Sequence, residues 1–444
     1  MLKADSNGKE NAAIKILKVL LSVKHERELI KEILFKRVYP NKKFNDLLWR
    51  VELSGLNKKL NLFWHVQNAS VSEQAVGITL LKELAERKLD HQFELEQNKL
   101  DKHFSSLQHQ SSQNLYDELI FNELSYINQV KSASRKEDSN LMRVDDSVNQ
   151  FFFFYKLKYA CDMLNRKNIF QREYDFSFIE HIVNYVSKHK IHLDVLSQIY
   201  LEIFHLLKHN EVDQFHSLKS LIYDHTDDID VKEVKDMFAY LQNFCVRQIN
   251  SGNVSFREEL FGIYNTLVER EIIIDNGKMY LFDYKNIATV AILLKQFDWV
   301  VEFTEKYTGY LAPKYQEGAR SYNLARIHFS KGEYRNTLKE LLHVNFTDAY
   351  YELGSRLLLA KVYYEQDDIP LLETVLGTFK IYINRNKVIS SYQKTIYLNF
   401  IKYANKLSKA YGDKNRLKAL KEEVEPLKKI VDKEWLIQKI EEQL

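Results

Sequence analysis

Residues 321–342, SYNLARIHFSKGEYRNTLKELL, carry the pattern that decides the fold. A large apolar residue precedes a small one in this stretch, and an aromatic residue follows ten positions after the apolar one. The apolar-small pair occurs once before and once after it, at spacings of 37 and 35 residues, followed ten positions later by an aromatic residue in the first copy and by isoleucine in the third. A small residue at a repeated position lets the backbones of two packed helices approach closely. The three copies are Ile287-Ala288 with Phe297, Leu324-Ala325 with Tyr334, and Leu359-Ala360 with Ile369.

This pattern resembles the tetratricopeptide repeat, which pairs two helices over about 34 residues. The resemblance rests on the apolar-small pairs and on Gly332-x-Tyr334, and it covers roughly Asn286 to Arg385. It departs from the family pattern at Thr337, where Ala is usual, and at His328, where Tyr is usual. The whole chain also resembles uncharacterised bacterial helical-repeat proteins. The resemblance implies an all-α fold, a right-handed α-solenoid of stacked antiparallel helix pairs.

The composition independently predicts helices. Apolar residues make up 45% of the 444 residues, which is enough to form a core and excludes a disordered chain. Only 12 Gly and 4 Pro occur, and no proline lies between Pro40 and Pro313. Sandwiches and barrels use these residues in their many turns, whereas helices are broken by them. We therefore expect an all-α chain that is either two domains or one elongated array.

We predict a domain division at residue 135. Residues 1–135 would form an N-terminal helical region, and residues 136–444 the repeat array with a C-terminal capping helix. The stretch Lys131–Asp146 is rich in Ser and charge and is the best linker. The last helix follows Pro426 and has Trp435 on its apolar face, with a polar opposite face that suits the end of a solenoid.

Several local signals mark where elements begin and end. Pro40 should end a helix, and Ser54-Gly55 is a possible break. The consecutive aromatic residues 151–155 predict a helix buried on every side. Asn276-Gly277 favours either a small hairpin or, more readily, a plain loop between helices. Two Ser-x-x-Glu capping boxes are Ser70 with Glu73 and Ser255 with Glu258. Further helices are expected at Phe176–Lys188, Leu193–Leu207, Val231–Gln248 and Tyr392–Tyr411.

Charge and cysteine content restrict the partners and the compartment. The chain has 64 basic and 61 acidic residues, so nucleic acid is an unlikely partner. Seven basic residues and one acid lie in Lys402–Lys421, which is either a patch for nucleic acid or the solvated face of two helices. Cys161 and Cys245 are the only cysteines, which fits a reducing compartment. No run is long and apolar enough to span a membrane, so we expect a cytoplasmic protein.

The residues that carry chemistry do not form a recognisable catalytic constellation. Acid-x-x-His pairs occur at Glu202/His205 and Glu340/His343, but no complete ligand set accompanies them. Neither a phosphate-binding glycine loop nor a Gly-x-Ser-x-Gly elbow is present. We expect no enzyme activity, no cofactor and no metal. A metal-dependent enzyme in the N-terminal half remains an alternative.

A binding surface is predicted on the first helix of each repeat. Its exposed positions should lie i, i+4 and i+7 apart and line a concave side. Each helix then offers a basic residue followed three positions later by an aromatic one, a pairing suited to a protein or peptide segment, especially an acidic one. The alternative is that the aromatic residues pack in the core. The predicted residues are Tyr322, Arg326 and Phe329 in one repeat and Leu357, Lys361 and Tyr364 in the next. The protein would be a non-catalytic scaffold or adaptor.

Overall fold

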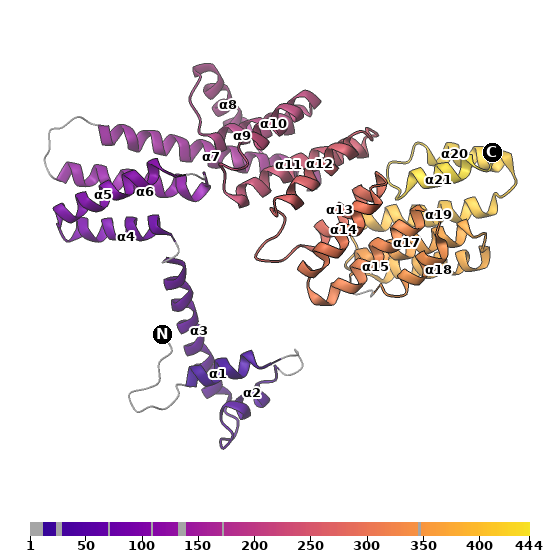
Figure 1. The fold of residues 1–444 in the computed structure, drawn as a ribbon, viewed down its shortest axis with the longest axis horizontal. Coiled ribbons are helices and arrows are strands. Elements are labelled where there is room, and N and C mark those ends of the chain that lie inside the picture. The colour runs from indigo at the N-terminus through magenta and orange to yellow at the C-terminus, as the bar shows by residue number, and fades with distance from the viewer. Residues whose placement is uncertain are drawn as a thin grey trace. The chain divides into compact units, whose positions relative to one another are not determined.

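The computed structural model describes residues 12–23, 29–69, 72–107, 110–131, 139–170, 173–344 and 348–444. Within these ranges the chain forms 21 α-helices and no strand (Figure 1). The all-α prediction is confirmed. Contacts divide the chain into unit 1, Met1–His209 with Tyr223–Glu233, and unit 2, Asn210–Ile222 with Val234–Leu444. The predicted boundary at residue 135 stays a prediction.

Unit 1 begins with a small three-helix module. Helices α1 and α2 both pack against neighbours around a core that includes Ile16, Phe35 and Trp49. Beyond it, α4 packs on α5 and α6, and α7 packs on α6, α8 and α9. The helices are α1 (Ala12–Leu21), α2 (Lys31–Val38), α3 (Asp46–Ala69), α4 (Glu73–Glu86), α5 (Asp90–Ser105), α6 (Ser112–Lys131), α7 (Ser139–Phe170), α8 (Ser177–His189) and α9 (Val195–His209).

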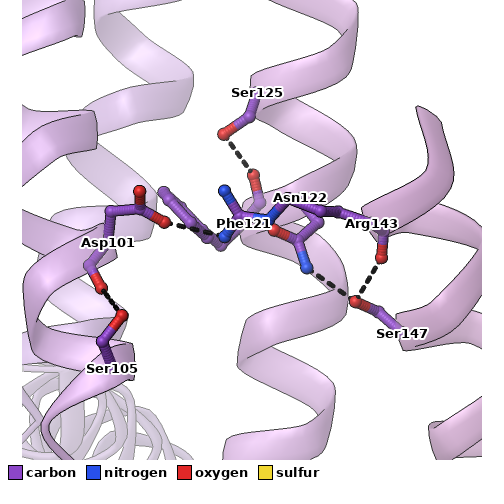
Figure 2. A network of polar contacts seen from close by, with 7 residues as sticks. All are labelled: Asp101, Ser105, Phe121, Asn122, Ser125, Arg143 and Ser147. Carbon is purple, nitrogen blue, oxygen red and sulfur yellow. Dashed lines mark hydrogen bonds and ion pairs between the residues drawn. The ribbon is translucent and has the colours of Figure 1, made fainter. Parts of the chain in front are cut away.

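Polar side chains join α5, α6 and α7 (Figure 2). Arg143 of α7 donates to the Asp101 carboxylate of α5 over 2.7 Å and lies above the Phe121 ring of α6. The Asn122 amide of α6 donates to the Ser147 hydroxyl of α7 over 2.6 Å. Asn122 is buried. These contacts fix how the three helices lie against one another.

Unit 2 is built from helices that pack on their neighbours in the chain. In addition, α13 packs on α15 and α15 packs on α17, so alternate helices also touch. Figure 1 shows α13 to α21 as orange and yellow ribbons. Its helices are α10 (Val212–Asp224) and α11 (Val231–Asn250), which lie mainly in unit 2, then α12 (Phe256–Glu269), α13 (Leu281–Leu293), α14 (Phe297–Tyr307), α15 (Pro313–Ser330), α16 (Tyr334–Leu341), α17 (Ala349–Glu365), α18 (Ile369–Arg385), α19 (Ser391–Lys409), α20 (Lys414–Val424) and α21 (Lys433–Glu441).

The same turn joins α13 to α14, α15 to α16 and α17 to α18. In each, one residue takes a left-handed conformation two positions before the second helix: Lys295 (φ 58°), Gly332 (φ 76°) and Asp367 (φ 55°). The next backbone N–H reaches back five residues to a carbonyl oxygen, 2.8–2.9 Å away, which is the Schellman arrangement that ends a helix. The predicted residues Phe297, Tyr334 and Ile369 each begin the second helix.

The repeated alanines occupy close contacts. Ala288, Ala325 and Ala360 are between 0% and 1% exposed. Small side chains at these positions allow neighbouring helices to approach without a cavity. The prediction that a small residue is needed here agrees with this burial.

Several predicted boundaries are wrong. Helix α3 runs through Ser54-Gly55, because Leu53 and Leu56 pack on the core of the module on either side. The proposed linker is helical from Ser139 onward, while residues 132–138 lie outside the described part.

Other local predictions also need correction. Ser255 does not cap α12, since its hydroxyl donates to Asn253 instead. Ser70 lies outside the described residues, and Ser72 caps α4. Phe152 is 38% exposed, so the aromatic run is not buried on every side. Asn276-Gly277 forms a tight turn in a loop between α12 and α13.

Candidate functional site

A groove of about 870 Å³ lies within unit 2. It is lined mainly by the first helices of successive pairs, α13, α15 and α17, and by α19 and α21. Five of the six residues predicted to bind a peptide are in this lining, and Tyr364 is not. The five are Tyr322, Arg326, Phe329, Leu357 and Lys361.

The Tyr322 ring forms one wall of the groove and fits against the backbone of α17. Tyr322 is 5% exposed and makes an edge-to-face contact with Tyr351 at 5.1 Å between ring centroids. A side-chain carbon at Gly354 would overlap the Tyr322 ring and hydroxyl. Glycine at position 354 therefore leaves room for the hydroxyl end of the Tyr322 ring against the neighbouring helix. The prediction that Tyr322 is exposed is wrong, because this contact buries it.

Two half-buried cations lie over this ring. The Arg326 guanidinium is 5.7 Å from the ring centroid of Tyr322, and the Lys285 amine is 5.9 Å from it. Arg326 donates to the Thr289 hydroxyl over 2.7 Å, and Lys285 donates to the Tyr350 carbonyl oxygen over 3.1 Å. Among the described residues, neither cation has a carboxylate within ion-pair distance.

The electrostatics of Lys285 reflect that environment. Burial and, to a smaller extent, the nearby charge of Arg326 lower the pKa of Lys285 to about 8. A buried amine without a counterion is less stable in its charged form. Asp348 offsets the charge of Lys285 only from beyond ion-pair distance, so an anion entering the groove would meet two positive groups without a directly paired carboxylate.

Lys361 differs from Arg326 although the two occupy equivalent repeat positions. Its side chain is buried, and its amine forms an ion pair of 2.7 Å with Asp432. The amine also lies 4.6 Å from the ring centroid of Phe329 and 5.3 Å from that of Trp435. The prediction that Lys361 is exposed is wrong, because Asp432 and the two rings cover it.

The C-terminal helix α21 closes this end of the groove. Trp435 is 8% exposed, which confirms its predicted burial, and its indole donates to Glu365 over 2.9 Å. Tyr364 packs edge-to-face on Trp435 at 5.2 Å between ring centroids. Burial raises the pKa of Tyr364 to about 12. Tyr364 therefore supports the capping helix.

The charges in the groove are unevenly compensated. Its three acidic side chains all form ion pairs with basic ones: Asp432 with Lys361, Glu365 with Lys439, and Glu434 with Arg257. The other basic residues in the lining are Lys285, Lys295, Arg326 and Lys331. The groove is thus positive on the side of α13 and α15. Sequence reasoning missed Lys285 and Thr289, since it counted positions only in the second and third copies; the two residues occupy the positions of Tyr322 and Arg326 in the first copy, 37 residues earlier.

No family model, curated protein or solved structure matches this chain. The geometry of the groove is accordingly interpreted from its own residues.

Other predicted sites gather fewer unpaired groups. Within the described ranges, no three or more His, Cys, Asp or Glu side chains come together in a way that could hold a metal ion. In the stretch Lys402–Lys421, four of the seven basic residues have acidic partners, namely Lys406, Lys409, Arg416 and Lys421. Among the described helices, none is long and apolar enough to cross a membrane.

Proposed function

We propose that unit 2 is a tetratricopeptide-like helical array that binds an acidic protein segment in its groove. The array would act as a non-catalytic scaffold or adaptor. Three helix pairs joined by the same left-handed turn support the repeat interpretation, as does the packing of α13 on α15 and of α15 on α17. The first helices of these pairs supply half of the residues that line the groove.

The uncompensated pair Lys285 and Arg326 carries the proposal. Both cations are half-buried, and neither forms an ion pair with a carboxylate among the described residues. Half-buried cations lack full hydration, so a ligand carboxylate placed between them would gain charge-assisted hydrogen bonds. Tyr322 beneath them offers an apolar face for the adjoining part of the ligand.

The groove also has a suitable size. Ligand sites commonly enclose roughly 300–1,000 Å³, and this one has about 870 Å³. An extended peptide of a few residues fits such a volume. Phe329 and Leu357 are partly buried beside it and provide apolar contacts for side chains that flank an acidic residue.

A fluorescent hexaglutamate peptide tests this function directly. The wild-type protein should bind it, and the double variant Lys285→Ala/Arg326→Ala should bind at least about tenfold more weakly, because two charge-assisted contacts are lost. The matched control is Lys339→Ala/Lys380→Ala, which removes two exposed lysines of the same unit outside the groove. Equal losses in both double variants, or no binding by the wild type, would refute the proposal.

A second experiment asks whether a protein occupies the groove in the cell. A photo-crosslinking amino acid at Ser330, an exposed residue of the lining, should capture a partner. The same group at Lys339 should not capture it. The capture should disappear when Lys285→Ala/Arg326→Ala is added. A partner captured equally from both positions would contradict binding in the groove.

A further inference from the structure

Two tyrosine hydroxyls in the groove have no hydrogen-bond partner among the described residues. Tyr322 is 5% exposed, and its hydroxyl end lies against Gly354. Tyr397 of α19 packs its ring on Phe379 at 5.8 Å between ring centroids. Both tyrosines line the groove, and neither hydroxyl bonds another described group. Because buried hydroxyls without a partner cost free energy, these two indicate a ligand that forms hydrogen bonds with them.

Both hydroxyls act as donors at neutral pH. Burial raises the pKa of Tyr322 and of Tyr397 above the ordinary value of 10.0, so both keep their protons. The positive charge of Arg326 acts on both tyrosines in the opposite direction, which shows that the three groups are neighbours. Asp432 is also near, but it is already paired with Lys361 at 2.7 Å. A ligand in this place would therefore meet donors.

The two cations of the groove also have donors to spare. Arg326 uses only one N–H group on Thr289, and Lys285 uses only one on the Tyr350 carbonyl oxygen. Both cations lie within 6 Å of the Tyr322 ring centroid. Together with the two hydroxyls they come from α13, α15 and α19, so the donors reach the groove from three helices.

We infer that the acidic group bound in this groove is a phosphorylated side chain of the partner segment. The inference rests on the proposed function of the groove. A carboxylate has its oxygens in one plane and carries a single negative charge. A phosphoryl group has three oxygens in a pyramid and carries about −1.5 to −2 charges at pH 7. It therefore neutralises both Lys285 and Arg326 and still has oxygens for the two hydroxyls.

The charge of the whole lining favours the same group. The lining contains seven basic and three acidic side chains, and all three acids form ion pairs with basic ones. Of the four remaining cations, Lys285 has the charge of Asp348 nearby and Lys331 that of Glu333. A positive excess remains, so a second negative charge on the ligand should strengthen binding more than it would in a balanced groove.

Labelled peptides that differ only in their central residue test this inference. The central residue is phosphoserine, phosphotyrosine, glutamate or serine, flanked on each side by leucine and glutamate. Fluorescence anisotropy with the full-length protein measures each affinity. We expect one of the phosphopeptides to bind at least about tenfold more tightly than the glutamate peptide, because the added charge and oxygen form further charge-assisted hydrogen bonds. The serine peptide should bind most weakly.

A second variant tests the hydroxyls while leaving both cations in place. Tyr322→Phe/Tyr397→Phe keeps both rings and should weaken binding of the preferred phosphopeptide at least about fivefold, because two hydrogen bonds to a charged group are lost. Binding of the glutamate peptide should change less than about twofold, since the cations suffice to pair its carboxylate. The matched control Tyr392→Phe/Tyr411→Phe removes two exposed hydroxyls outside the groove and should change neither affinity. Thermal melting confirms that both variants fold.

Three outcomes would overturn the inference: phosphopeptides that bind no more tightly than the glutamate peptide, equal losses in the two tyrosine variants, or inorganic phosphate that binds as tightly as the preferred phosphopeptide. The first outcome leaves the proposed function intact, because the glutamate peptide would still bind. Absence of binding by every peptide would overturn the inference and the proposed function together.

Discussion

The contacts between packed helices differ in kind between the two units. In unit 1, α5, α6 and α7 meet through polar pairs such as Asn122 with Ser147 (Figure 2). In unit 2, successive helices meet at small apolar residues, of which Ala325 and Ala360 are buried almost completely. A hydrogen-bonded pair requires a donor on one helix and a matching acceptor at one position of the other. A small apolar residue, by contrast, can occupy the same helix–helix contact in every repeat. This difference explains why a repeated sequence pattern is found in unit 2 alone.

The largest effect on stability is expected when an apolar contact between helices is disrupted. Ala325→Trp and Ala360→Trp should each lower the free energy of unfolding by about 3 kcal/mol, because a large ring forces the packed backbones apart. Ala419→Trp, at an exposed position of α20, should change it little. Urea denaturation measures all three variants. Unchanged stability in both core variants would show that these alanines do not occupy close contacts between helices.

Loss of a polar contact between helices should lower the free energy of unfolding less than disruption of an apolar contact. Ser147→Ala leaves the buried Asn122 amide without its acceptor and should lower the free energy of unfolding by about 1–2 kcal/mol. Ser105→Ala removes an exposed hydroxyl that bonds only the Asp101 carbonyl of its own helix, so its effect should be near zero. The melting temperatures of the Ser147→Ala and Ser105→Ala variants measure this difference. Equal melting temperatures would mean that the network contributes nothing.

Titration should separate the buried amine of Lys285 from buried carboxyl groups by the sign of the pH dependence. Burial depresses the pKa of Lys285 from 10.5 to about 8, so the folded state holds fewer protons than the unfolded state between these values, and stability rises with pH there. Lys285→Met should raise the free energy of unfolding by about 1 kcal/mol at pH 7, with the gain shrinking above pH 8. In unit 1, burial raises the pKa of Asp117 and Asp194, so their contribution falls as pH rises through the acid range.

Denaturation curves of wild type and Lys285→Met between pH 6 and about pH 10 measure this difference. Lys339→Met serves as the control, since Lys339 is exposed on α16. A gain in Lys285→Met that does not depend on pH would assign the effect to packing. In that case burial of the Lys285 amine would not lower the stability of the folded state.

The smallest effect concerns the turns between paired helices. Lys295→Gly and Asp367→Gly should each raise the free energy of unfolding by about 0.5 kcal/mol, because glycine adopts a left-handed conformation without steric strain. Gly332→Ala should lower it, since Gly332 already occupies the equivalent position. Guanidinium denaturation resolves differences of this size in replicate curves. Destabilisation by both glycine variants would contradict a shared turn.

Much of the fold followed from short-range patterns. The helix that ends at Val38, the helix starts at Phe297, Tyr334 and Ile369, and the burial of Trp435 depend on residues close in sequence or on one apolar face. The helix break predicted at Ser54-Gly55 does not occur. Leu53 and Leu56 pack on the core on either side of it, and this packing overrides the local preference for a break. Such packing is a property of the whole module.

The site was predictable only in part, for the same reason. Arg326 and Lys361 have the same local surroundings in sequence, yet only Lys361 meets an acid, Asp432, 71 residues later. Lys285 joins Arg326 from the preceding repeat through Thr289, 37 residues before it. Repeat spacing indicates which helix lines the groove. It does not indicate which charges are neutralised by distant parts of the chain.

The ion pair between Arg257 and Glu434 links α12 to α21 across 177 residues. Contacts within each helix pair involve short loops and can form early, because closing a short loop loses little chain entropy. The Arg257–Glu434 contact requires both α12 and α21 to be in place, so it should form among the last. Because the Glu434 side chain is 68% exposed, this ion pair contributes only about 0–1 kcal/mol. Fraying that begins at α21 must break it, so α21 should open slightly less readily than a terminal helix without such a contact.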